Sequence, residues 1–86
     1  MRRRLVVGNW KMNGGLASNA RLLDAITSRW QRTPDRALAV CVPFPYLGQA
    51  QAALTGTPIG WGAQDVSEHS SGAFTGDVAA SMLADF

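Results

Sequence analysis

Three short apolar runs, each followed by a stretch with helical spacing, constrain the fold of this 86-residue chain more than any other feature. The runs cover residues 5–7, 37–42 and 59–63, and they are too short for typical helices. The stretches after them, residues 16–32, 46–54 and 77–86, are expected to be helices. Alternating strands and helices imply parallel strands joined by right-handed crossovers. The expected fold class is therefore α/β, with the order β-α-β-α-β-α.

The first apolar run leads directly into two polar side chains. Residues 5–7 are typical of a strand buried on both faces. Asn9 and Lys11 follow with one residue between them, so an extended backbone points both to the same side. Ligands bind at the carboxyl ends of parallel strands, which makes this pair a candidate site. From the spacing alone, a solvated lysine at a strand end remains the alternative interpretation.

Local patterns predict several further details. The first helix is expected to bury the stripe formed by Leu22, Leu23, Ile26 and Trp30. Cys41 lies inside an apolar run and is expected to be a small buried residue. Asp77 is a plausible N-cap for the last helix. Residues 65–76 form a long polar loop, and loops of this length are commonly functional.

Two motifs resemble the triosephosphate isomerase family. Residues 8–13, Gly-Asn-Trp-Lys-Met-Asn, resemble the opening signature of that family. Gly-Ala-Gln-Asp at 62–65 and Gly-Ala-Phe-Thr-Gly-Asp at 72–77 resemble its third strand and the loop after it. Residues 43–47, Pro-Phe-Pro-Tyr-Leu, resemble the second strand–helix junction. The resemblance covers essentially the whole chain.

The resemblance implies an incomplete barrel. Residues 1–86 would be one segment, the first three βα units of a (β/α)8 barrel, with no complete domain boundary in the chain. A complete barrel needs roughly 250 residues, so the barrel is not closed here. The family interconverts dihydroxyacetone phosphate and glyceraldehyde 3-phosphate through an enediolate, in glycolysis and gluconeogenesis. By resemblance the parent enzyme would be a cytoplasmic homodimer without a cofactor.

The resemblance also implies roles for individual residues. Asn9 and Lys11 match substrate-binding positions, and Lys11 would act in catalysis by stabilising the developing oxyanion. In the family, the loop after the third strand reaches into the neighbouring subunit, where its threonine holds the partner's Asn and Lys. The residues implied at this dimer interface are Met12, Gln64, Phe74, Thr75 and Asp77. Asp77 stands where many members carry Glu, so its reach toward a partner is shorter.

The catalytic His and Glu of the family belong to later strands, which this chain does not contain. His69, the only histidine, lies in the polar loop and matches no family motif, so it receives no catalytic role. The segment alone is therefore expected to be inactive. Two alternatives remain: an inactive truncated fragment, or a small α/β module that binds a phosphate ester. The second is weakened by the lack of a glycine-rich phosphate loop before a helix.

Charge and cysteine content exclude other classes. The chain has a net charge of +2, but Arg2, Arg3 and Arg4 supply three of its eight positive charges. They are interpreted as a solvated strand entry, not as a nucleic-acid site, because no aromatic or further basic residues cluster with them. No run is long enough to span a membrane, and no metal-binding motif is present. A single cysteine cannot form an internal disulfide, which favours a reducing compartment.

Overall fold

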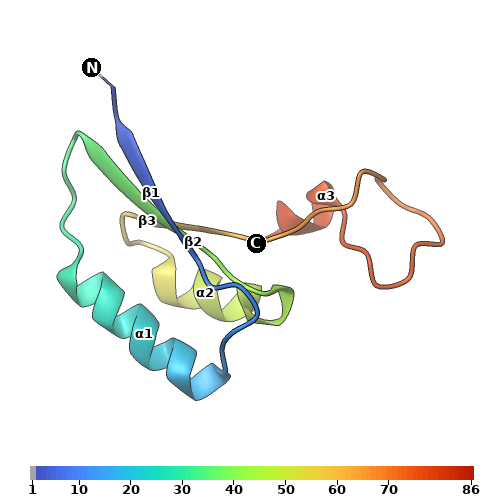
Figure 1. The fold of residues 1–86 in the computed structure, drawn as a ribbon, viewed down its shortest axis with the longest axis horizontal. Coiled ribbons are helices and arrows are strands. Elements are labelled where there is room, and N and C mark those ends of the chain that lie inside the picture. The colour runs from blue at the N-terminus through green and yellow to red at the C-terminus, as the bar shows by residue number, and fades with distance from the viewer. Residues whose placement is uncertain (1) are drawn as a thin grey trace.

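The computed structural model describes residues 2–86. Its elements are β1 (Arg4–Asn9), α1 (Leu16–Arg29), β2 (Arg36–Cys41), the 3-10 helix η1 (Phe44–Tyr46), α2 (Leu47–Leu54), β3 (Ile59–Gly62) and α3 (Ala80–Leu83). The strands form one parallel sheet in the order β1-β2-β3 (Figure 1). The expected α/β class, with parallel strands alternating with helices and a sheet that does not close, is confirmed.

Helices α1 and α2 pack on one face of this sheet, where the core lies (Figure 1). The parallel register pairs Leu38 with Ile59 and Val40 with Trp61, so these side chains share the covered face. Val40 and Ile59 are each 2% exposed, and Leu54 of α2 is fully buried. Burial of this stripe between sheet and helices is the main source of stability for the segment.

The other face and the β1 edge of the sheet stay open. Leu5, Val6 and Val7 are 63%, 52% and 48% exposed, so the expectation that this strand is buried on both faces is wrong. The buried core contains residues of β2 and β3 and none of β1, which lies at the edge of the sheet with β2 as its one neighbour. The radius of gyration is 14.1 Å, whereas a compact domain of this length has about 12 Å. The segment is therefore more extended than a closed domain.

Helix α1 ends at Arg29, three residues before the predicted end at position 32. Trp30 leaves the helical conformation, with φ −78° and ψ 124°, and its ring packs against the core. The Arg36 guanidinium lies 5.6 Å from the centroid of that ring. Of the predicted stripe, Leu23 is buried, whereas Leu22 is 45% exposed beside an open hollow, so its predicted burial is wrong.

The connection from β1 to α1 is fixed by a buried amide. Asn19 is 2% exposed, and its Oδ1 accepts a hydrogen bond from the Gly15 N–H at 3.2 Å. Its Nδ2 donates to Gln49 Oε1 at 3.0 Å, which joins α1 to α2. Gly14 has φ +138°, and a Cβ there would lie 2.8 Å from both Asn19 Oδ1 and the Tyr46 ring. Glycine is thus required where the chain leaves β1.

The C-terminal segment contains less helix than predicted. Helix α3 spans only Ala80–Leu83, and Ala79, not Asp77, stands at its N-cap, so the predicted cap is wrong. The Asp77 N–H donates instead to the Phe74 carbonyl at 3.0 Å, in a turn at the tip of the loop. Trp61 Nε1 donates to the Phe86 carbonyl at 2.7 Å and anchors the segment to β3.

Candidate functional site

Lys11 has an unusual backbone conformation directly after β1. Its φ is +55°, and it is the only non-glycine residue with positive φ among residues 2–86. A left-handed conformation costs a side-chain-bearing residue roughly 1–2 kcal/mol, so it needs support from its surroundings. The Asn9 side chain gives part of that support, because its Oδ1 accepts a hydrogen bond from the Lys11 N–H at 2.8 Å.

The Gln64 side chain supplies the rest from the end of β3. Its Nε2 donates to the Lys11 carbonyl at 2.9 Å and to the Cys41 carbonyl at 3.0 Å. The same nitrogen lies 3.3 Å from Asn9 Oδ1. One amide therefore joins residues at the ends of all three strands. The predicted pair Asn9 and Lys11 is held together by a third side chain that follows 53 positions after Lys11.

The Lys11 ammonium is free to meet an anion. The residue is exposed, and within residues 2–86 no acidic group forms a salt bridge with it. The Asn9 side-chain amide contacts the Lys11 backbone, and its Oδ1 is already occupied by the Lys11 N–H and by Gln64 Nε2. This arrangement aims the Nδ2 donor of Asn9 away from those contacts. A fixed cation beside an amide donor can stabilise negative charge on a ligand oxygen.

The polar loop at 65–77 lies apart from this cluster. In Figure 1 it projects away from the sheet. Its predicted interface residues Phe74, Thr75 and Asp77 are exposed, and Phe74 keeps 45% of its surface accessible. Met12, beside Lys11, is 96% exposed. The structure thus brings Asn9, Lys11 and Gln64 together, but not the loop residues.

Other candidate groups lie away from a reactive arrangement. Cys41 is half-buried, less covered than predicted, and its carbonyl accepts hydrogen bonds from Gln64 and from the Trp10 N–H. His69 contacts Glu68 at 3.5 Å within the loop. Across residues 2–86 no group of three His, Cys, Asp or Glu side chains could hold a metal ion. No helix in that range has the length and apolar character needed to cross a membrane.

Sequence reasoning missed two features. It assigned Gln64 to a subunit interface and did not anticipate that its amide would join the strand ends. The only signal was a long polar side chain placed directly after a glycine-bearing strand. It also gave His69 no role, whereas the structure stacks its ring on Phe74 with the centroids 4.0 Å apart.

Comparison with known proteins gives one consistent result. Residues 4–86 match the family model described as triosephosphate isomerase. The triosephosphate isomerase of Cupriavidus pinatubonensis is 61% identical over the whole chain, and that of Thiobacillus denitrificans is 60% identical. The Bordetella pertussis protein of the same name is 60% identical over 99% of the chain. This chain spans 34% of the length of each of these relatives.

Proposed function

This chain belongs to the triosephosphate isomerase family, and we propose that it forms three βα units of an enzyme that interconverts dihydroxyacetone phosphate and glyceraldehyde 3-phosphate. Residues 1–86 would be one continuous segment of its (β/α)8 barrel. The observation that carries the proposal is the Lys11 backbone, held by Asn9 and Gln64 at the carboxyl end of parallel strands in a residue whose side chain is exposed. The enzyme would act in the cytoplasm without a cofactor.

The chemistry explains the need for that cation. Removing a proton next to the substrate carbonyl creates an enediolate, whose negative charge accumulates on oxygen. A cation fixed before the reaction stabilises this charge without reorganising during the step. Lys11 would supply the cation and would also bind the substrate phosphate. Asn9 would donate to a substrate oxygen through Nδ2, since its Oδ1 is occupied.

The loop at 65–77 would complete the site of a second copy. It projects away from the chain's own strand ends, so its tip is available to a neighbour (Figure 1). Met12, exposed beside Lys11, would meet the incoming loop. The homodimer interface would then contain Met12, Gln64, Phe74, Thr75 and Asp77. Thr75 would hold the partner's Asn9 and Lys11.

Residues 1–86 alone would not complete the reaction. The family's proton-transfer groups come from later strands, and Glu68 and His69 contact each other on the loop. That loop projects away from the sheet (Figure 1). The chain would therefore contribute binding and charge stabilisation, while the rest of the barrel would contribute the base.

The test is a fusion enzyme. It joins residues 1–86 to the remaining two-thirds of the Cupriavidus pinatubonensis protein, and its conversion of glyceraldehyde 3-phosphate is measured. We expect turnover from the fusion enzyme and none from residues 1–86 alone. Lys11→Ala should lower kcat/KM by about 10²- to 10³-fold. Arg21→Ala, which removes an exposed cation on α1, is the matched control and should change nothing. Equal activity of the two variants would refute the role of Lys11.

A further inference from the structure

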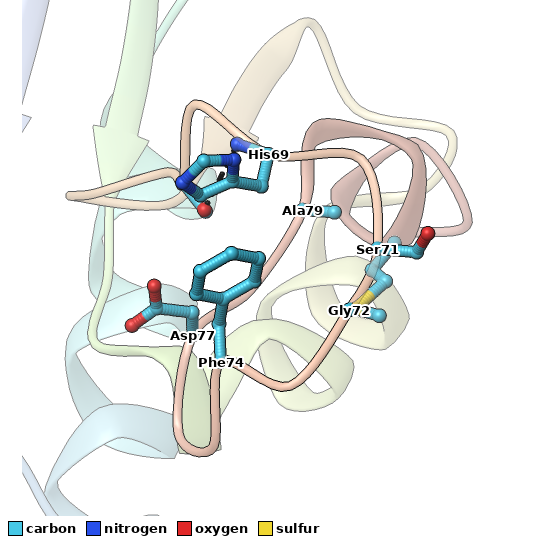
Figure 2. A pocket seen from close by; sticks show the side chains of 8 residues that line it. His69, Ser71, Gly72, Phe74, Asp77 and Ala79 are labelled. Atoms are coloured by element: carbon cyan, nitrogen blue, oxygen red, sulfur yellow. Dashed lines mark hydrogen bonds between the residues drawn. The ribbon is translucent and has the colours of Figure 1, made fainter.

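The loop between β3 and α3 contains an aromatic stack that the proposed chemistry does not use. The rings of His69 and Phe74 are 4.0 Å apart between centroids and are inclined by only 1° (Figure 2). Aromatic pairs of this kind stabilise a structure beyond the area that they bury. The two residues lie five positions apart in a polar segment, so the stack closes the loop on itself.

Phe74 also begins the turn at the tip of the loop. Its carbonyl accepts a hydrogen bond from the Asp77 N–H at 3.0 Å, which makes Thr75 and Gly76 the two central residues of a β-turn. Gly76 has φ +92°, as the second central residue of a type II turn requires. The position of Thr75 therefore depends directly on where Phe74 is held.

The Phe74 ring is confined by backbone as well as by His69. A Cβ on Gly72 would lie 2.9 Å from the ring, so the ring packs directly on the glycine backbone (Figure 2). The base of the loop is closed by the Ser67 N–H, which donates to the Val78 carbonyl at 2.8 Å. The cavity beside the stack measures about 50 Å³, which accommodates no more than a few water molecules. The stack thus shapes the loop and is not a ligand site.

We propose that His69 is a positioning residue for the loop tip: its imidazole, stacked on Phe74, holds the turn that carries Thr75 in the shape that a second copy of this chain binds. The proposal rests on the homodimer of the proposed function. Association costs free energy when interface loops must be ordered, and a loop shaped in advance avoids part of that cost. His69 and Phe74 keep 46% and 45% of their surfaces exposed, which leaves area for the partner.

The test measures the dissociation constant of the fusion dimer by sedimentation across a dilution series. His69→Ala should raise this constant about 2- to 10-fold, the range expected for loss of one aromatic pair. His69→Phe keeps a flat ring and should restore the constant to within about twofold of the original. Glu68→Ala is the control, because its side chain is 87% exposed and its contact with His69 should contribute little.

A second measurement tests the His69–Phe74 stack independently of dimer formation. In the fusion enzyme, the imidazole proton resonances of His69 should be displaced by the Phe74 ring and should return to ordinary positions in Phe74→Leu. An unchanged dissociation constant in His69→Ala would overturn the positioning role alone. So would a dissociation constant of His69→Phe that stays as high as that of a weakened His69→Ala dimer. A monomeric parent fusion with an intact stack would overturn the homodimer, and the positioning role with it. Unchanged His69 resonances in Phe74→Leu would refute the stack itself.

Discussion

The carboxyl end of the sheet and the loop at 65–77 are held by different kinds of contact. At the sheet end, one Gln64 amide reaches Lys11 and Cys41, which lie 53 and 23 positions away along the chain. In the loop, the stack and the turn join residues three to five positions apart. The sheet end is therefore set by tertiary structure, and the loop largely by itself. We expect changes at the sheet end to affect chemistry and changes to the His69–Phe74 stack of the loop to affect association, whereas Thr75 at the loop tip would act on the partner's site.

Gln64→Leu should give the largest effect of the variants that distinguish the two regions. It keeps the side-chain size but removes the donor to the Lys11 and Cys41 carbonyls. The Lys11 carbonyl is left unpaired, whereas the Cys41 carbonyl keeps its bond from the Trp10 N–H. Because the left-handed Lys11 then depends on Asn9 alone, kcat/KM of the fusion enzyme should fall about 10- to 100-fold. The loss should persist at high enzyme concentration. Full recovery on concentrating the enzyme would instead place Gln64 in assembly alone.

A pair of glycine substitutions separates the regions by stability. Gly14 has a φ of +138°, and Gly14→Ala would place a Cβ 2.8 Å from Asn19 Oδ1. Asn19 joins α1 to α2 beside the connection from β1. The substitution should lower the free energy of unfolding of the fusion enzyme by about 1–3 kcal/mol. Denaturant titration provides the measurement.

Gly72→Ala is the matched change in the loop, with a φ of +133° and a Cβ 2.9 Å from the Phe74 ring. The backbone strain at this φ is shared with Gly14, but the steric overlap can relax by moving an exposed ring. Gly72→Ala should therefore lower the free energy of unfolding by less than Gly14→Ala does, while weakening the dimer. Equal destabilisation by the two substitutions would show that the loop is as tightly coupled to the sheet as α1 is.

Thr75→Ala should give the smallest effect, because it removes one uncharged hydrogen-bonding group from the loop tip. If Thr75 holds the partner's Asn9 and Lys11, kcat/KM should fall about 2- to 10-fold. This loss should persist at enzyme concentrations where the dimer is fully formed, unlike that of His69→Ala. Steady-state kinetics at high enzyme concentration, with Ser71→Ala as the exposed-hydroxyl control, would decide whether the loop contributes to chemistry at all.

Local patterns in the sequence were sufficient for the positions of the strands. Short apolar runs predict β2 and β3 closely, and Asn9 and Lys11 lie at the end of β1 as expected, but the left-handed Lys11 contradicts the extended backbone from which a shared direction of their side chains was predicted. The positive φ of Lys11 could not be predicted, because its support comes from Gln64 on another strand. The exposure of β1 follows from the missing neighbour, which no local pattern encodes.

Two errors in the predicted helix boundaries, the start of α3 and the end of α1, share one physical origin. A helical pattern begins at Asp77, but the Val78 carbonyl accepts the Ser67 N–H and Ala79 is extended, so α3 begins only at Ala80. Trp30 continues the helical spacing of α1, yet packing of its ring against the core ends the helix before it. In both cases a contact outside the local pattern outweighed helix propensity.

The most direct measurement of the central claim is kcat/KM of Gln64→Leu and His69→Ala fusion enzymes across a dilution series that spans the dimer dissociation constant. The account predicts that the His69→Ala deficit disappears as the enzyme is concentrated, because the loop acts through association. It predicts that the Gln64→Leu deficit stays constant, because the amide sets the Lys11 conformation within its own chain. Parallel recovery of both variants, or recovery of neither, would contradict the division between a sheet end that sets chemistry and a loop that sets assembly.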